Sequence, residues 1–302
     1  MSADAAVTQH SNVVAKITLF RSLFRGRDDL YARRFASLRT GKTGYGPACA
    51  NEWARGLCDE RAVRCQDCPS RRFLPLSDET IRQQLTGRDE RGREFVVGLY
   101  PMLLDETCVF LAIDFDKEGW RVDIGAVREA CRRFGLPAAV ERSRSGNGGH
   151  LWLFFAEVLP AVLARKLGAH ILTETMERRP EVGLDSYDRL FPNQDALPKG
   201  GFGNLIALPL QKRPRESDDS VFLDERLLPW PDQWAFLSTM RRITHAQAES
   251  IVRSAEQRGR VVGVRFPALD EDQEGDAEPW TAPPSRCRAE ASIVGPLPED
   301  WN

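Results

Sequence analysis

The sequence predicts an α+β fold, with short strands and helices along a chain of 302 residues. Three observations favour this class. Apolar and β-branched runs at 93–104 and 107–116 are typical of strands, 138–158 has the pattern of a hairpin with a glycine-rich turn, and 124–134 and 160–179 have the pattern of helices. With 42% hydrophobic and 28% charged residues, the chain can bury a sizeable core, which excludes disordered, collagen-like and low-complexity proteins.

The hydropathy pattern argues against a membrane or secreted protein. No apolar run approaches the roughly 20 residues that a membrane helix needs. The first sixteen residues are polar, and Lys16 interrupts the only apolar stretch among them, so no secretory signal is expected. We therefore expect a cytoplasmic protein without a membrane partner.

Charge is distributed unevenly along the chain, although the net charge is only -2. Residues 16–72 contain 13 Lys and Arg against 6 Asp and Glu. This basic part fits a polyanionic partner, and a solvated helix face explains it equally well. Residues 270–278 hold six acids and no base, and prolines follow them, which predicts a linker or a tail.

Four of the seven cysteines fall within twenty residues, and no export signal accompanies them, so a disulfide framework is not expected. The four are Cys49, Cys58, Cys65 and Cys68, and the last two have the spacing of a metal-binding knuckle. Four thiolates suit one structural zinc ion in tetrahedral geometry. A redox-active pair is the alternative, but it leaves the first two cysteines unexplained. Two others, Cys108 and Cys131, are expected in the core, and Cys287 stands alone.

Residues 36–43 fit a relaxed phosphate-loop pattern, but their surroundings do not. The strict pattern needs a glycine where Ala36 stands, a buried strand before the loop and a helix after it. Residues 25–38 have the pattern of a charged amphipathic helix, and the glycines and Pro47 that follow the loop cannot continue a helix. Nucleotide hydrolysis at this loop is therefore not expected.

The strand predicted at 107–116 ends in two acids, Asp114 and Asp116. Side chains alternate along a strand, so both carboxylates point to one face. Their repulsion is relieved if they hold divalent cations, and two cations about 3.5–4 Å apart are the device of phosphoryl and nucleotidyl transfer. A strand that simply emerges into solvent is the alternative.

Polar groups suited to phosphate flank the glycine-rich turn at 146–149. They are Arg142, Arg144, Ser145 and His150. With the backbone N–H groups of the turn, they could offer positive charge and a hydroxyl to a nucleoside triphosphate. This pattern is weak on its own, because glycine-rich hairpins are usually only hairpins and a single histidine is more often structural than functional.

The order of these motifs resembles the archaeo-eukaryotic primase superfamily. The motifs are Asp114-x-Asp116, then Ser145-Gly-x-Gly-Gly-His150-Leu-Trp, then a later Asp before a glycine-rich strand. From Leu19 to Ile243, the tracts LFRSLFRGR, YGPAC, SYDRLFPNQD and KGGFGNLIALPLQ resemble, more specifically, the primase-polymerase module of TOTE conflict systems, where it accompanies a helicase and a nuclease. We find neither helicase nor nuclease motifs in these 302 residues.

The resemblance implies a catalytic core built on an RRM-like antiparallel sheet with flanking helices. It implies two catalytic ions, Mg²⁺ or Mn²⁺, with single-stranded or primed template DNA and nucleoside triphosphates as partners. By motif matching, Asp114, Asp116 and Asp188 are the metal ligands and catalytic residues. His150 is matched to a contact with the triphosphate of the incoming nucleotide. A helicase or nuclease of the same system is the implied protein partner.

Three acids, Asp185, Asp188 and Asp195, lie in the stretch that should carry the third carboxylate. We expect Asp188, since residues 186–191 alternate polar and apolar side chains like a short strand that could place one acid beside the other two. Asp195 lies among turn residues. Asp185 would point with Tyr187 rather than with Asp188 if the strand began that early.

Three functions remain open from the sequence. The first is a DNA primase-polymerase, which carries out template-directed nucleotidyl transfer from a nucleoside triphosphate onto a 3′-hydroxyl. The second is a metal-dependent nuclease, which needs the same carboxylates but no triphosphate pocket. The third is a non-enzymatic, zinc-containing DNA-binding module. The sequence does not separate de novo priming from extension, or ribonucleotides from deoxynucleotides.

The sequence divides into four predicted segments. They are a basic helical segment at 1–44, a zinc-binding module at 45–75, a primase-polymerase core at 76–245, and a helix with an acidic, proline-containing tail at 246–302. The zinc module and the basic segment before it are expected to hold template phosphates.

Overall fold

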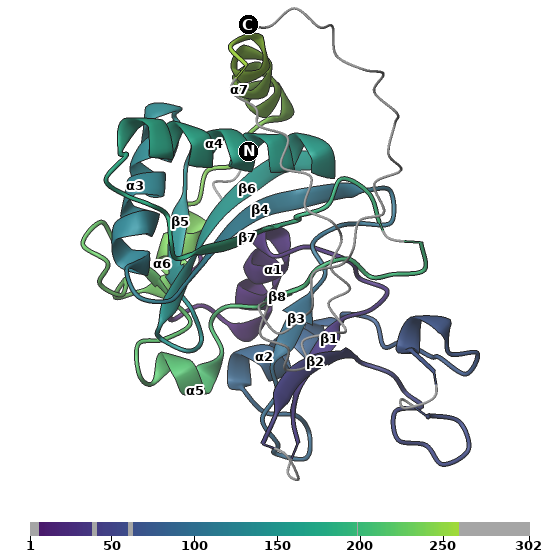
Figure 1. Cartoon of the computed structure of the whole chain (residues 1–302). Coiled ribbons are helices and arrows are strands. Elements are labelled where there is room, and N and C mark those ends of the chain that lie inside the picture. Colours follow the sequence, from purple (N-terminus) through teal and green to yellow (C-terminus); the bar gives the residue numbers. More distant parts are fainter. Residues whose placement is uncertain (1–5, 38–40, 60–62, 198, 260–302) are drawn as a thin grey trace, which may run out of the picture. The chain divides into compact units, whose positions relative to one another are not determined.

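The computed structural model describes residues 6–37, 41–59, 63–197 and 199–259. Two sheets dominate this part of the chain, one of five strands and one of four, and neighbouring strands in both are antiparallel (Figure 1). A mixed fold with antiparallel sheets is therefore confirmed. The predicted acidic tail and Cys287 lie outside the described residues.

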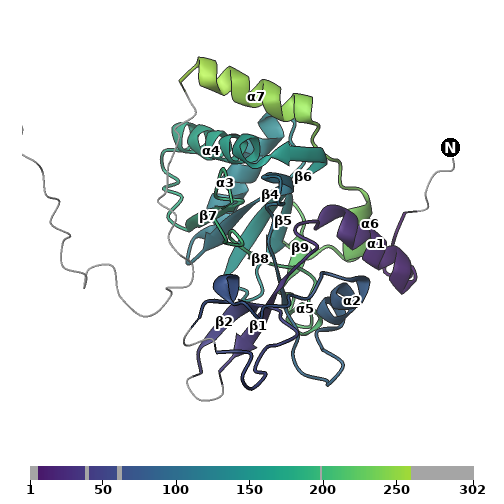
Figure 2. The same cartoon turned by 90° about the vertical axis from the view of Figure 1, so that its right-hand side faces the viewer.

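The five-stranded sheet has the order β7-β4-β6-β5-β9. Its strands are β4 (Thr107–Asp116), β5 (Ala139–Arg142), β6 (Gly148–Pro160), β7 (Tyr187–Phe191) and β9 (Val221–Leu223). On one face lie helices α3 (Trp120–Arg133) and α4 (Ala161–Arg178), and α7 (His245–Gln257) packs on α4 (Figure 2). This arrangement leaves the other face for the remaining elements.

The four-stranded sheet has the order β2-β1-β3-β8. Its strands are β1 (Ala32–Ala36), β2 (Thr43–Pro47), β3 (Val97–Leu99) and β8 (Ile206–Ala207). The other elements are α1 (Val13–Leu23), the short 3₁₀ helix η1 (Cys65–Asp67), α2 (Asp78–Thr86), α5 (Lys212–Arg215) and α6 (Gln233–Ser238). Strands from three of the four predicted segments thus share this sheet, and the division into segments stays a prediction.

Alternation along the central strands divides the core into two layers. In β4, Leu111 and Ile113 belong to a cluster with the apolar residues of α3, α4 and α7. Their neighbours Phe110 and Ala112 belong to a second cluster, which includes residues of α1, α2, β3 and α6. A strand covered on both faces has no solvent side, which explains why β4 reads as a continuous apolar run. The expected core position of Cys108 and Cys131 is confirmed, since both are buried.

The helix predicted over 25–38 is wrong. Residues 32–36 form β1, which pairs with β2 and β3. At Gly26, a Cβ atom would lie 2.3 Å from the carbonyl oxygen of Tyr100, so the chain passes too close to the core for a side chain there. The charges are paired in the strand and the loop before it, Arg27 with Asp29 and Arg34 with Glu94. Sheet pairing with distant residues overrides the local helical pattern.

The other predicted elements are found with shifted ends. Helices predicted at 124–134 and 160–179 are α3 and α4, and the strand at 107–116 is β4. The predicted strand at 93–104 shrinks to β3, and β8 forms within the tract KGGFGNLIALPLQ. The hairpin turn lies at 143–147, two to three residues before the predicted one, because Ser143 already donates its N–H to the carbonyl of Gly148. The loop at 36–43 is followed by strand β2 instead of a helix, so the phosphate-loop context is absent from the described residues.

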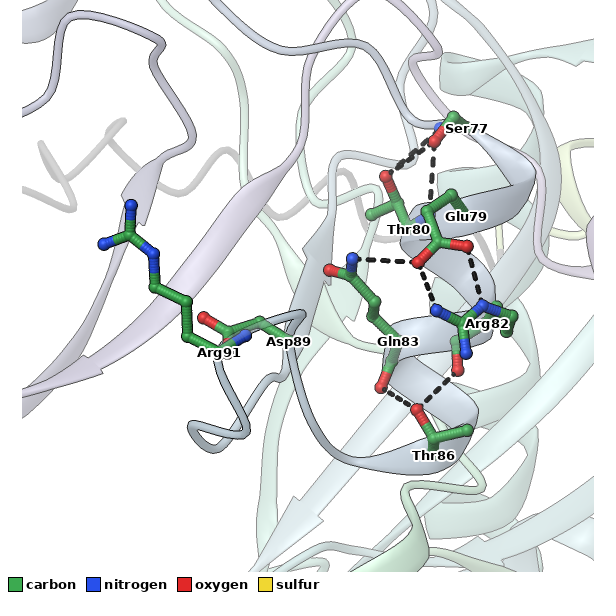
Figure 3. A network of polar contacts seen from close by, with 8 residues as sticks. All are labelled: Ser77, Glu79, Thr80, Arg82, Gln83, Thr86, Asp89 and Arg91. Carbon is green, nitrogen blue, oxygen red and sulfur yellow. Dashed lines mark hydrogen bonds and ion pairs between the residues drawn. The ribbon is translucent and has the colours of Figure 1, made fainter.

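Helix α2 begins and ends at clear local signals. The Ser77 side chain accepts from the N–H of Thr80, the Thr80 hydroxyl accepts from the N–H of Ser77, and Gly87 ends the helix in the left-handed conformation. On its exposed side, Glu79 accepts from Arg82 at 2.5 and 2.6 Å and from Gln83 at 3.0 Å (Figure 3). These caps and pairs are the local contribution to the stability of α2, and Ile81 adds a contact with the core.

No helix in the described ranges has the length and apolar character that crossing a bilayer requires.

Candidate active site

Three aspartates converge where strands β4 and β7 lie side by side. Asp114 and Asp116 occupy alternate positions at the end of β4, and Asp188 lies on β7, which pairs antiparallel with β4. One carboxylate oxygen from each lies within 4.8 Å of the others. The predicted short strand that places Asp188 beside the other two acids is therefore confirmed, while its role as a ligand stays a prediction.

The two rejected acids lie elsewhere. Asp195 forms a bidentate ion pair with Arg165, at 2.5 and 2.8 Å. Asp185 lies in the turn before β7, with its carboxylate folded back toward Gly183. Neither belongs to the acidic group that the described residues form around Asp114.

The electrostatics of Asp114 fit a cation-binding site. Burial, together with the negative charges of Asp116 and Asp188, raises the pKa of Asp114 to about 6 against the opposing effect of His150. Its buried Oδ1 atom has no hydrogen-bond donor. A buried carboxylate oxygen without a donor, beside two further carboxylates, is the hard oxygen donor set that Mg²⁺ and Mn²⁺ prefer. The three acids therefore fit the divalent ions that the family implies.

His150 lies beside this group, on the neighbouring strand β6. It is paired directly with Asp114 across the sheet, and its Nε2 atom lies 3.4 Å from Asp114 Oδ1. Burial lowers the pKa of His150, but the negative charges of Glu141 and Asp114 outweigh burial and raise it to about 9. The Nε2 edge of the imidazole thus faces the acidic group.

The sequence interpretation missed Glu141, which contacts His150 from strand β5. Its Oε2 atom lies 2.9 Å from His150 Nδ1, and the carboxylate is almost completely buried. One signal was available, since a glutamate inside the apolar run of a predicted strand needs a buried partner.

The two glycines that begin strand β6, directly after the turn, lie close to the end of β4, and only glycine allows this approach. At Gly148, a Cβ atom would lie 2.5 Å from the carbonyl oxygen of Phe115 and 2.6 Å from Asp116 Oδ1. At Gly149, it would lie 2.7 Å from the ring of Trp120. The start of β6 therefore packs directly against the end of β4.

The remaining predicted phosphate contacts lie on or next to this turn and already have partners. Arg144 donates to Gln211 at 2.8 Å and to Glu94 at 2.6 Å, and Arg142 donates to the carbonyl of Asp218 at 3.2 Å. The Ser145 hydroxyl accepts from the N–H of Asn147 at 3.3 Å. The structure thus joins the three aspartates and His150 in one group, with these side chains along the turn beside it.

The four clustered cysteines line one cavity, together with residues such as Pro47 and Phe73. None of the four is in a disulfide. The backbone N–H of Arg72 donates to the Cys49 sulfur at 3.3 Å, as amides do to metal-bound thiolates. The four sulfur atoms do not all lie within 4.8 Å of one another, in contrast to the three aspartates. Their chemistry and common cavity fit a zinc ion, whose presence stays a prediction.

Comparison with known families identifies the chain. Residues 15–251 match the family model for the archaeo-eukaryotic primase domain of TOTE conflict systems. The chain belongs to this family. The resemblance found in the motifs is therefore confirmed, and nucleotidyl transfer is the activity class of these primases and polymerases. No curated protein matches the chain.

Two solved structures are similar to this primase-family chain at low identity. One is the polymerase domain of Mycobacterium tuberculosis ligase D in complex with DNA, with 15% identity, a TM-score of 0.37, and coverage of 82% of this chain and 86% of that one. The other is the archaeo-eukaryotic primase domain of the cyanophage S-2L primase-polymerase, with 10% identity, a TM-score of 0.30, and coverage of 69% and 96%.

Proposed function

We propose that the chain is a DNA primase-polymerase that performs template-directed nucleotidyl transfer. The convergence of Asp114, Asp116 and Asp188 next to His150 carries this proposal. The acids suit cations, and the imidazole and the neighbouring turn suit the phosphates that such cations accompany.

Asp114, Asp116 and Asp188 would hold two divalent cations, Mg²⁺ or Mn²⁺. When bound, these ions would lower the pKa of the attacking 3′-hydroxyl and would neutralise charge on the leaving pyrophosphate. The hydroxyl oxygen forms a bond to the α-phosphorus while the bond from that phosphorus to the bridging oxygen breaks. Asp114 is the least exposed of the three acids, and its Oδ1 atom has no hydrogen-bond donor that would compete with an ion.

The hairpin turn would bind the triphosphate. His150 offers an imidazole next to the acids, and Ser145 offers a hydroxyl. Arg142 and Arg144 would add positive charge by exchanging part of their present contacts for phosphate oxygens. The close approach of Gly148 to Asp116 places this turn within reach of ions held by the acids.

The cysteine module would bind one structural zinc ion and hold template DNA. It carries Arg64, Arg71 and Arg72 among its described residues, while Arg61 lies outside them. Fixed arginines next to the core could neutralise template phosphates. A helicase or nuclease of the same conflict system is the protein partner that we propose.

A primer-extension assay tests the proposal. Purified protein is incubated with single-stranded template, labelled nucleotides, and Mg²⁺ or Mn²⁺, with and without primer. We expect products that depend on template and metal. Degradation of the template without incorporation would instead support the nuclease, and DNA binding without either reaction would support the non-enzymatic module.

A further inference from the structure

A row of three ionisable side chains crosses three adjacent strands of the five-stranded sheet. Glu141 on β5 is paired directly with His150 on β6, and His150 is paired directly with Asp114 on β4. Directly paired residues project from the same face of a sheet. His150 therefore lies between two carboxylates, and only one of them belongs to the acidic group of the candidate active site.

The two edges of the His150 ring have different environments. At one edge, Nδ1 lies 2.9 Å from Glu141 Oε2, within hydrogen-bond distance. At the other edge, Nε2 lies 3.4 Å from Asp114 Oδ1, an oxygen that receives no hydrogen bond. The hydrogen bond to Glu141 thus holds the ring through Nδ1, and the Nε2 edge of the ring is directed toward the acidic group.

Glu141 is itself held in place. The same oxygen that contacts His150 also accepts the indole N–H of Trp152 at 2.9 Å. Trp152 is fully buried, and the Glu141 side chain is only 2% exposed. Two contacts to one buried oxygen leave the carboxylate little freedom, so the position of the imidazole is fixed through Glu141 by the core.

Burying a carboxylate costs several kcal/mol unless charged or hydrogen-bonding partners compensate. A neutral acceptor would be enough for the indole N–H of Trp152, so this hydrogen bond alone does not explain a carboxylate at position 141. A carboxylate at this position accepts an imidazole N–H more strongly than a neutral acceptor does. The charge of Glu141 is therefore directed at His150 more than at Trp152.

We propose that Glu141 is a positioning residue for nucleotide binding. It accepts a hydrogen bond from the Nδ1 edge of His150 and so directs the Nε2 edge of the ring toward the triphosphate of the incoming nucleotide. This inference rests on the proposed function, since it assigns Glu141 to the same triphosphate site. Carboxylates that orient a ligating histidine have the same geometry in metal sites.

Nuclear magnetic resonance tests the contact without any activity measurement. The chain has four histidines, and a His150→Ala variant of ¹⁵N-histidine-labelled protein assigns the His150 signals. We expect an Nδ1-bound proton shifted downfield by the carboxylate, and we expect Glu141→Ala to abolish that shift. An Nδ1 atom without a proton in the wild-type protein would overturn the proposal.

Steady-state kinetics tests the consequence. Glu141→Ala should raise the nucleotide KM by about 10-fold, the lower end of the usual effect of such orienting partners, with a smaller change in kcat. Glu141→Gln should restore most of the affinity, because its amide oxygen can take the place of Oε2. Glu174→Gln is the matched control, since Glu174 is a buried glutamate on α4 that pairs with Arg178, and it should leave the nucleotide KM unchanged.

A double variant separates positioning from general stability. If Glu141 acts through His150, then Glu141→Ala should add nothing to the KM effect of His150→Ala. Additive losses, or a KM equal to that of Glu174→Gln, would overturn the inference. If Glu141→Ala does not fold, Glu141→Leu fills the same volume and gives the same comparison.

Failure of the inference can be told from failure of the proposed function. If the wild-type protein binds no nucleotide by titration calorimetry, both fall. If the wild type binds nucleotide and extends a primer while Glu141→Ala has wild-type KM, only the role of Glu141 falls.

Discussion

The acidic site and the cysteine module reach their geometry by different physical means. The aspartates and His150 project from paired strands of a sheet that is covered on both faces, and one carboxylate oxygen of each aspartate lies within 4.8 Å of the others. In the cysteine module, none of the described residues from 49 to 75 is fully buried, and its one regular element there is the three-residue helix η1. The first region is built by strand pairing. The second has no buried residue between 49 and 72 and contacts the core where its chain returns, as at Phe73, whose ring packs on Phe202.

This difference predicts whether each region needs a bound ion in order to stay folded. A site made by a hydrophobic core is preorganised, so removal of its ions should leave the fold intact. A module without a core obtains its folding free energy from its metal. The predictions below test this comparison, from the largest expected effect to the smallest.

The largest effect is expected for Asp114→Ala combined with Asp116→Ala. Loss of the cations should reduce nucleotide incorporation by at least about 1,000-fold, because a metal ion contributes several kcal/mol to the transition state. The fold should survive. Burial and neighbouring acids raise the pKa of Asp114 to about 6, so the folded state binds a proton more tightly than the unfolded chain, and ionised Asp114 opposes folding at pH 7.

Two measurements check this prediction. Primer extension gives the activity, and thermal unfolding of metal-free protein at pH 7 should show a melting temperature no lower than that of the wild type. Extension at the wild-type rate would refute the two-metal assignment. A collapsed fold would show that the acidic site is not preorganised by the sheet.

Single substitutions of the three candidate acids sharpen the same point. Asp188→Ala should lower incorporation by about 100-fold or more, because Asp188 belongs to the acidic group. Asp195→Ala removes only an ion pair with Arg165, and Asp185→Ala removes a turn residue, so both should keep most activity. Activity in Asp188→Ala together with inactivity in either of the others would contradict the assignment.

Cys65→Ser or Cys68→Ser should destabilise the cysteine module and leave the acidic site intact. We expect the wild-type protein to contain one zinc ion per chain by elemental analysis, and each variant to lose it. Loss of zinc should loosen the module most between residues 49 and 72, because none of the described residues there is buried. Template binding should weaken by roughly tenfold and depend less steeply on salt, since fixed arginines are lost.

Outcomes for the cysteine variants are distinct from those for the aspartates. Hydrogen exchange should rise in residues 45–75 and stay unchanged in strand β4. Wild-type protein without zinc would contradict the prediction, and so would a zinc-free variant with wild-type exchange.

The smallest effect is expected for His150→Ala. His150 provides one of several groups near the triphosphate, so we expect a nucleotide KM about 10-fold higher with kcat less affected. The matched control is His245→Ala, because His245 lies on α7 with its imidazole facing Glu249. An unchanged nucleotide affinity in His150→Ala would show that His150 has only a structural role.

The structural elements that depend only on residues close in the sequence were predicted well. Strand β4 with its terminal acids, helices α3 and α4, and the short strand that carries Asp188 all follow from local alternation and helical patterns. The cysteine cluster is visible in the spacing alone. The helix predicted over 25–38 failed where pairing with β2 and β3 decided the conformation.

By itself, the sequence determined which side chains each strand presents to a common face, since alternation is a property of the extended backbone. It thereby placed Asp114 with Asp116 and identified the family motifs. Only the tertiary structure decided which residues of different strands meet. The register of β5 against β6 brings Glu141 to His150, and a shift of one residue would turn Glu141 to the opposite face. That register depends on hydrogen bonds and packing between strands distant in sequence, so no local pattern contains it.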